Sequence, residues 1–257
     1  MIESVGIIGV GHLASYIVGG LRRASHEIKI ILSPRNINKS KDLATRFGTI
    51  IAQNNQDVVN SANIIIITTR PEDTITVSEN LRFQTGQIVI SMAIGITLEN
   101  LKSSIAPATV VRANTISCAA INQSPTLLFP DNPQARTILA LLGQVHVLPD
   151  EACFTSASAI GAFYGWIYAL LDETISWTTH TGVPQQTARN VVLETVRGAV
   201  NMALNEPNSD LKAILATLAT PGGITKQGLN VLHQKQSLEV WTNALNVVHK
   251  RLSNVKK

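Results

Sequence analysis

The stretch that decides the fold is Val5-Gly6-Ile7-Ile8-Gly9-Val10-Gly11-His12-Leu13-Ala14. It begins with a short apolar run typical of a buried strand, and a helical pattern follows through Leu21. Between strand and helix stands Gly-x-Gly-x-x-Ala, which is the pattern of a dinucleotide-binding turn in the context that such a turn requires. Gly9 permits the tight turn, Gly11 lets the backbone approach a pyrophosphate, and Ala14 allows close helix packing. The alternative is an ordinary turn between a strand and a helix.

A pyrophosphate in this turn would sit on free N–H groups at the positive end of the helix. Leu13 would belong to the same cofactor-binding turn. His12 would either donate to the pyrophosphate or be a tolerated loop residue. The sequence thus predicts a nucleotide cofactor held by residues 9–14.

Short aliphatic runs alternate with helical patterns up to about residue 149. We expect strands at residues 5–8, 28–32, 49–51, 63–68, 87–91, 109–112, 126–129 and 145–148. These runs are continuous rather than alternating in hydrophobicity, which indicates strands buried on both faces of a parallel sheet. The sequence therefore predicts an α/β fold with a doubly wound, mostly parallel sheet (a Rossmann domain) over residues 1–150.

From Asp150 onward no strand pattern follows, and helices are expected at residues 152–180, 184–204, 209–218 and 237–253. Of all 257 residues, 45% are hydrophobic and only 15% are charged, against roughly 25% charged in an average soluble protein. Residues 151–257 are therefore predicted to form an all-helical domain that carries substrate contacts and forms a homodimer by packing against a copy of itself.

The remaining composition excludes several classes of protein. Aromatic residues make up 4% and the net charge is only +4, without the interleaved basic and aromatic stripe of a nucleic-acid platform. The two cysteines and six histidines lack metal-ligand spacing, so no metal site is expected. The longest aliphatic run, Ile64 to Ile67, is too short to span a bilayer, and the N-terminus has no targeting pattern. We expect a cytoplasmic protein without nucleic-acid or membrane partners.

The end of the second expected strand decides between NAD and NADP. NAD enzymes usually carry an acidic residue there, which binds the ribose 2′-hydroxyl. Here the residues are Ser33-Pro34-Arg35-Asn36, without a carboxylate. Ser33 could donate to a 2′-phosphate and Arg35 could pair with it in bidentate fashion. We therefore predict NADP(H) rather than NAD(H); the alternative is a solvated arginine in a loop.

Further stretches match one known family. The most distinctive is Thr220-Pro221-Gly222-Gly223-Ile224-Thr225, followed by Gly228-Leu229. Ala62 to Pro71 and Ser91 to Ile96 also match, as does Gly182-Val183-Pro184. Together with the glycine loop, these stretches make the chain resemble the pyrroline-5-carboxylate reductases nearly from end to end.

The resemblance implies cofactor contacts at Thr69, Arg70, Pro71 and Ala93, and substrate contacts at Gly161, Tyr164, Gly222, Gly223, Ile224 and Thr225. Pro-Gly-Gly before a helix also leaves unblocked N–H groups that suit a small carboxylate, although a capped turn between two helices is the alternative. The family likeness assigns Thr225 as the catalytic residue, lying against the imine nitrogen while hydride passes from nicotinamide C4 to the imine carbon.

Two segments depart from the family pattern. Ser158-Ala159-Ile160-Gly161-Ala162-Phe163-Tyr164 stands where the family has Ser-Gly-Ser-Gly-Pro-Ala-Tyr, so Ile160 and Phe163 would enlarge an apolar wall. Ile116 replaces the asparagine of Met-Pro-Asn-Thr-Pro. The prediction is an NADPH-dependent reductase in proline biosynthesis that converts pyrroline-5-carboxylate to proline and forms a dimer or a ring of dimers. The alternatives are a related imine or keto-acid reductase, a β-hydroxyacid dehydrogenase, or a non-catalytic NADP-binding sensor.

Overall fold

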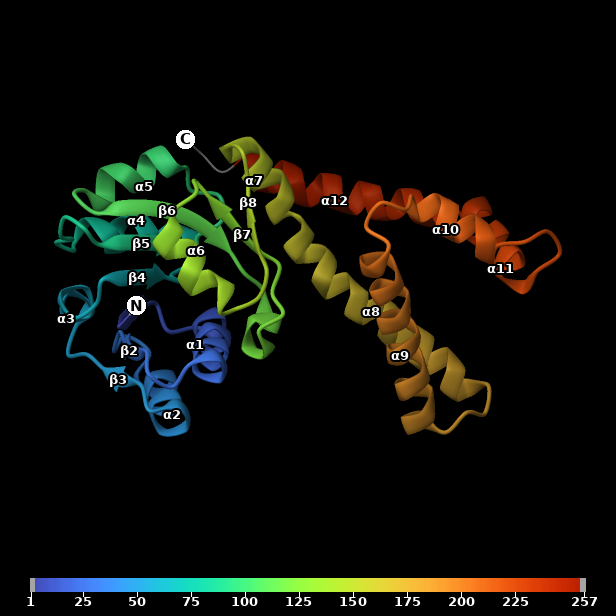
Figure 1. Cartoon of the computed structure of the whole chain (residues 1–257), viewed down its shortest axis with the longest axis horizontal. Helices are drawn as coiled ribbons and strands as arrows, with labels where there is room; N and C mark the ends of the chain where they lie inside the picture. The colour runs from blue at the N-terminus through green and yellow to red at the C-terminus, as the bar shows by residue number, and fades with distance from the viewer. Residues whose placement is uncertain (1–2, 255–257) are drawn as a thin grey trace. The chain divides into compact units, whose positions relative to one another are not determined.

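The computed structural model describes residues 3–254. They divide into two compact units (Figure 1): residues up to Gly161 together with the chain from His249 onward, and Ala162–Val248. The first unit contains the sheet, and the second is built from helices.

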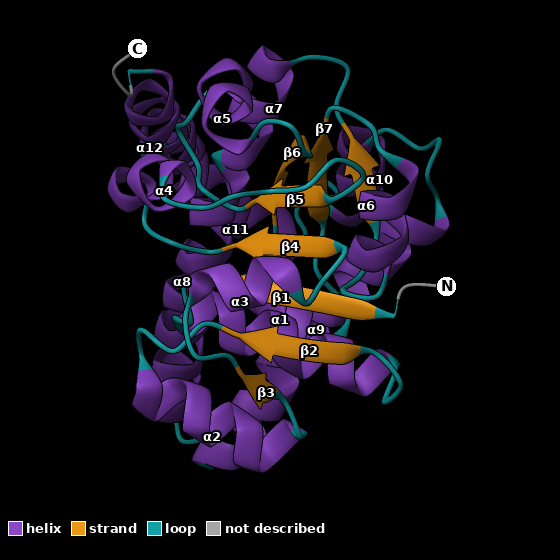
Figure 2. Cartoon of the chain, turned by 90° about the vertical axis from the view of Figure 1, so that its left-hand side faces the viewer, coloured by secondary structure: helices purple, strands orange, loops and turns teal. Residues whose placement is uncertain are grey.

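The sheet of the first unit has eight strands in the order β3-β2-β1-β4-β5-β6-β7-β8. All neighbours pair in parallel except β6 and β7, which are antiparallel. Figure 2 shows the parallel strands β2, β1, β4 and β5 side by side. The doubly wound, mostly parallel sheet is thus confirmed, and each expected strand is present. The bounds are β1 (Ser4–Ile8), β2 (Lys29–Leu32), β3 (Ile50–Ile51), β4 (Ile64–Ile67), β5 (Ile88–Ser91), β6 (Thr109–Asn114), β7 (Thr126–Phe129) and β8 (Val145–Val147).

Helices cover both faces of this sheet, which explains why the central strands are apolar throughout. Alternate strand residues face one core with α1, α2 and α6, as Ile7 and Ile66 do. The others face a second core with α3, α4 and α5, as Ile8 and Ile67 do. The bounds are α1 (His12–Ala24), α2 (Ile37–Phe47), α3 (Asn55–Asn60), α4 (Pro71–Glu79), α5 (Leu98–Ile105), the 3-10 helix η1 (Ser117–Ile121), α6 (Pro133–Ala140) and α7 (Glu151–Ser158).

The second unit contains helices whose apolar side chains are left open. The bounds are α8 (Ile160–His180), α9 (Gln185–Asn205), α10 (Leu211–Leu218), α11 (Ile224–Gln234) and α12 (Ser237–Ser253). Only Ala188 and Val192 of α9 are buried, and α8, α10, α11 and α12 bury no residue. Trp177 is 66% exposed and Leu204 70%. Exposed apolar side chains gathered on neighbouring helices are typical of an interaction surface.

The division between the two units falls after Gly161, within α8, and α7 contacts β7 of the sheet. The sequence analysis instead places the end of the dinucleotide-binding domain at residue 150, and this domain boundary remains a prediction. Within the described residues, Glu151–His180 is one run that is long and apolar enough to cross a membrane by length and composition, and an 18-residue stretch of it has a mean hydropathy of 1.3. The core helix of a soluble protein can pass the same test.

Candidate dinucleotide and substrate sites

The turn between β1 and α1 has the geometry that its glycines predict. Gly9 adopts a φ of +94°, in the left-handed region that favours glycine. A Cβ on Gly9 would lie 2.7 Å from the backbone nitrogen of Thr69. Thr68 donates from Oγ1 to the Gly9 carbonyl at 2.7 Å. The turn is therefore held tightly against the segment that follows β4.

The start of α1 is open to an anion. Gly11 caps the helix without a side-chain hydrogen bond, and the first turn contains no acidic residue. A Cβ on Gly11 would have nothing within 4 Å. Free N–H groups and the helix dipole both favour negative charge at such an end.

A cavity of about 760 Å³ opens at the carboxyl ends of β1, β2 and β4. Ligands bind at this edge in doubly wound folds. Its lining residues are Gly9, Val10, Gly11, His12, Arg35, Asn36, Ile37, Asn38, Lys39, Thr68, Thr69, Arg70 and Asp73. Arg35, Lys39 and Arg70 supply positive charge, while Asp73 is the only acidic group among the lining residues within the described part of the chain. The cavity suits a ligand that carries several negative charges.

The other residues expected at the cofactor lie next to this cavity or behind it. Leu13 and Ala14 pack on the core beneath the turn, where Ala14 is fully buried. Pro71 is in the first turn of α4, beside Arg70, which caps that helix. Ala93 is buried against the core after β5. These side chains shape the site rather than line it.

The expected role of Ser33 is wrong in its geometry. Its side chain is fully buried, and its Oγ accepts a hydrogen bond from the Gly9 N–H at 3.1 Å. Ser33 therefore supports the glycine turn instead of presenting its hydroxyl to a 2′-phosphate. The groups that do line the cavity here are Arg35 and the start of α2.

Sequence reasoning missed the contribution of the first turn of α2. Asn36 caps this helix by accepting from the Lys39 N–H, and Asn38 and Lys39 line the cavity. A capping asparagine after a proline, followed by a helical pattern, is the signal that could have revealed this second helix start.

The residues expected at the substrate lie in both units. In the second unit, α11 begins at Ile224 after Gly222, whose φ is +78°. Its first intrahelical hydrogen bond runs from the Gln227 N–H to the Gly223 carbonyl at 3.1 Å, and the Gly223 N–H donates to the Thr220 carbonyl at 3.0 Å. The N–H groups of residues 224–226 therefore point out of the helix end. Thr225 stands in this first turn, and its neighbour Ile224 is 86% exposed.

Helix α8 carries the other two expected substrate residues. In the first unit, a Cβ on Gly161 would lie 3.7 Å from Ile116 Cγ2 and 3.9 Å from Asn114 Nδ2. Tyr164 is in the second unit, where its hydroxyl lies 2.8 Å from that of Tyr168. Gly161 thus faces the segment after β6 in which Ile116 replaces an asparagine.

The two apolar replacements in α8 differ in their surroundings. Phe163 packs edge-on against Trp166 and Trp241, with ring centroids 6.5 and 5.6 Å away. Ile160 is 52% exposed. Of the two, Ile160 is the side chain open to a ligand.

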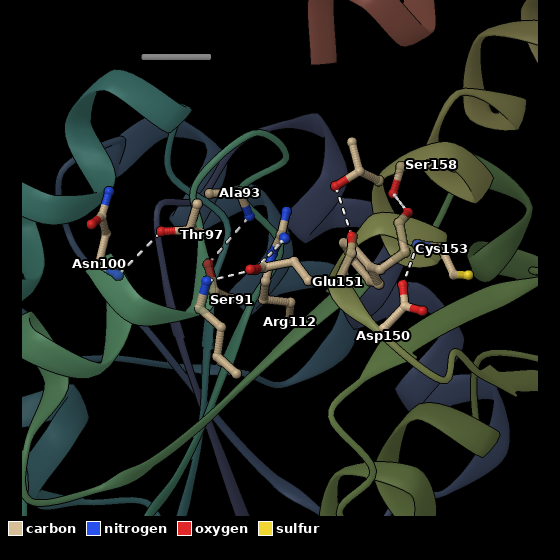
Figure 3. A network of polar contacts seen from close by, with 12 residues as sticks. Ser91, Ala93, Thr97, Asn100, Arg112, Asp150, Glu151, Cys153 and Ser158 are labelled. Atoms are coloured by element: carbon tan, nitrogen blue, oxygen red, sulfur yellow. Dashed lines mark hydrogen bonds and ion pairs between the residues drawn. The ribbon is translucent and has the colours of Figure 1, made fainter. Parts of the chain in front are cut away.

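An ion pair anchors β6 to the first turn of α7. Figure 3 shows Arg112 and Glu151 facing each other, with Arg112 Nη1 2.7 Å from Glu151 Oε1. The Arg112 side chain is only 3% exposed, and burial lowers its pKa while Glu151 opposes that shift. Glu151 also accepts the Leu98 N–H at 2.6 Å. The pair fixes the strand that leads to Asn114.

Two family models of known proteins match two different parts of the chain. Residues 4–95 match a family model described as NADP oxidoreductase coenzyme F420-dependent. Residues 151–255 match one described as pyrroline-5-carboxylate reductase dimerisation.

Relatives match over nearly the whole chain. Pyrroline-5-carboxylate reductase from Methanosarcina acetivorans is 24% identical, over 95% of this chain and 94% of its own. Pyrroline-5-carboxylate reductase 2 from Bacillus subtilis is 22% identical, over 99% and 96%.

Solved structures agree with the fold. That of 1-pyrroline-5-carboxylate reductase from Streptococcus pyogenes has a TM-score of 0.85 at 25% identity, covering 97% of this chain and 98% of that one. Pyrroline carboxylate reductase from Plasmodium falciparum, solved with NADP bound, has a TM-score of 0.88 at 18% identity, covering 100% and 98%.

Proposed function

We propose that the chain is a member of the pyrroline-5-carboxylate reductase family and that it reduces pyrroline-5-carboxylate to proline with NADPH. The observation that carries the proposal is the cationic cavity at the strand ends of the first unit. The open start of α11, with Thr225 in its first turn, supplies a candidate site for the substrate carboxylate. A charged dinucleotide and a small carboxylate need these two kinds of site.

NADP(H) is the cofactor, and the residues of the cavity fit it. The open start of α1 would hold the pyrophosphate. Arg35 and Lys39 would neutralise the 2′-phosphate, because a guanidinium and an ammonium both pair well with phosphate. Ser33 would support this site indirectly, because its Oγ accepts a hydrogen bond from the Gly9 N–H and so holds the glycine turn. NADPH, when bound, supplies a hydride from the C4 of its nicotinamide.

The chain's own residues would bind and orient the substrate. The N–H groups at the start of α11 would hold the substrate carboxylate. The Thr225 hydroxyl would donate a hydrogen bond to the imine nitrogen and so polarise the C=N bond. The imine carbon would then accept the hydride, while the nitrogen takes up a proton from solvent to give the amine. Positioning of this kind accounts for much of catalysis in two-substrate reactions.

A specific observation favours a second candidate, which is reduction of a bulkier cyclic imine or keto acid. Ile116 approaches the position of Gly161 where the family pattern has an asparagine, and the exposed Ile160 stands beside it. Both changes replace small or polar groups by apolar ones. Such a wall would favour an apolar ring substituent over a polar one.

A substrate panel tests the proposal. NADPH oxidation is followed at saturating NADPH with pyrroline-5-carboxylate, larger cyclic imines and keto acids. We expect the highest kcat/KM for pyrroline-5-carboxylate. A larger value for a substituted imine would favour the second candidate, and NADPH binding without turnover of any substrate would indicate a non-catalytic sensor.

Variants at Thr225 test its assignment. Thr225→Val keeps the side-chain shape and removes the hydroxyl, and we expect it to lower kcat by about 10²-fold. Thr225→Ser keeps the hydroxyl and should restore most of the activity. Equal rates for the two variants would remove Thr225 from the mechanism.

The protein is a homo-oligomer, because its helical half is a dimerisation domain. This assembly gives the exposed apolar faces of α8 to α12 a partner. We propose a dimer or a ring of dimers in the cytoplasm, and light scattering that reports a monomer would contradict the assembly.

A further inference from the structure

The cavity of the first unit contains an ion pair between residues far apart in sequence. Arg35 Nη1, after β2, lies 3.4 Å from Asp73 Oδ2, in the first turn of α4. Their side chains are 68% and 39% exposed, and both residues line the cavity. The pair is therefore part of the binding surface and is accessible to a ligand.

The backbone that carries Asp73 is held in place. The Asp73 N–H donates to the Arg70 carbonyl at 3.0 Å. Thr74 Oγ1 donates to the same carbonyl at 2.9 Å and lies 2.8 Å from Thr69 Oγ1. Asp73 is therefore carried on a fixed helix turn of the cavity wall rather than on a loop.

This carboxylate lies beside the group that should select the cofactor. An acid at the end of β2 normally accepts a hydrogen bond from the ribose 2′-hydroxyl of NAD, and here that position has none. Asp73 brings a carboxylate to the same arginine from a different element. We propose that Asp73 sets how far this chain prefers NADPH over NADH, weakening the binding of NADPH and strengthening that of NADH; this inference rests on the proposed dinucleotide site.

The two nucleotides would use the pair differently. With NADPH, Arg35 turns from Asp73 to the 2′-phosphate, and the carboxylate then faces a dianion of like charge. With NADH, Arg35 stays paired, and the carboxylate accepts from the 2′-hydroxyl. The same side chain therefore has opposite effects on the two affinities, which a merely structural residue would not have.

Asp73→Asn tests this inference, because it removes the charge and keeps the shape. Repulsion between a carboxylate and a dianion about 6 Å apart changes Kd by about threefold at physiological ionic strength. We expect the variant to bind NADPH about threefold more tightly and NADH about threefold more weakly, as measured by titration of nucleotide fluorescence. Near 1 M salt, where the Debye length is about 3 Å, the gain for NADPH should largely disappear.

Asp42→Asn is the matched control. Asp42 pairs with Arg46 on the exposed surface of α2 at 3.1 Å, and neither residue lines the cavity. Asp42→Asn likewise removes a negative charge from beside an arginine. It should change neither the affinity for NADPH nor that for NADH.

Three outcomes would overturn the inference: unchanged affinities in Asp73→Asn, equal shifts for both nucleotides, or the same shifts in Asp42→Asn. If Asp73→Asn misfolds, Asp73→Ser provides the same comparison. All these measurements are of binding alone. A chain that binds nucleotides as expected but does not turn over pyrroline-5-carboxylate would refute the proposed function and leave the role of Asp73 standing.

Discussion

Alanine at Gly9 should mainly lower the stability of the fold, whereas alanine at Gly11 should mainly weaken nucleotide binding. At Gly9, the φ of +94° costs an L-residue about 1–2 kcal/mol. The new Cβ would also meet Thr69 N at 2.7 Å and Thr68 C at 2.9 Å, and such overpacking costs about 1–3 kcal/mol. We therefore expect Gly9→Ala to lower the free energy of unfolding by about 2–5 kcal/mol.

Gly11→Ala should leave the fold nearly unchanged. Its φ of −110° is accessible to alanine, and its Cβ would project into open space on the cavity wall. We expect a stability loss of about 1 kcal/mol or less. The methyl group would occupy the place where a pyrophosphate approaches the backbone, and should weaken NADPH binding by about tenfold or more.

Urea denaturation and NADPH titration of the two variants provide the measurements. Gly9→Ala should lower the urea midpoint clearly, while Gly11→Ala should mainly raise the Kd for NADPH. Wild-type affinity in Gly11→Ala would refute the placement of the pyrophosphate, and wild-type stability in Gly9→Ala would refute the close approach of β1 to the β4 segment.

Three further substitutions probe contacts of residues that do not line the dinucleotide cavity. Glu151→Ala strands the buried guanidinium of Arg112, and urea denaturation should show a loss of about 2–3 kcal/mol, reduced from the value for a fully buried pair because Glu151 is 35% exposed. Ser33→Ala leaves the Gly9 N–H without its acceptor and should cost about 1 kcal/mol in the same assay, with weaker NADPH binding. Asp150→Ala removes a helix cap; the bond from the Cys153 N–H lowers the pKa of Asp150 below the usual value of an aspartate, so its stabilisation is present above the unfolded-state pKa and is lost as the pH falls through the lowered folded-state pKa. The difference in Tm from wild type should therefore shrink as the solution is acidified through this range, and a constant difference would contradict this assignment.

The parts of the fold that the sequence predicts are those with a local cause. The continuous apolar runs of β1, β2, β4 and β5, with helical patterns between them, predict strands at the centre of a parallel sheet. The glycines at residues 9 and 11 mark the turn after β1. The antiparallel pairing of β6 with β7 has no such signal, because the run Thr126–Phe129 reads the same in either direction. The break at Ala159 between α7 and α8 also lacks a proline or glycine to mark it.

The sequence likewise predicts only those parts of the candidate site that a local pattern marks. Ser33 has a side chain that suits both a phosphate and a backbone N–H, and only its burial at the end of β2 decides between them. Asp73 lies 38 residues from Arg35, so no local pattern could place its carboxylate in the cavity. Pairings of this kind depend on tertiary structure alone.

The open faces of α8 to α12 have a consequence for mixtures of chains. The helical half contains none of the groups that line the dinucleotide cavity, so a copy with a damaged cavity keeps the surface that its partner recognises. A cell that makes intact and damaged copies together should assemble hybrids in proportion to their supply. Losses of output in such a cell would then exceed the share of damaged chains wherever one copy depends on its neighbour.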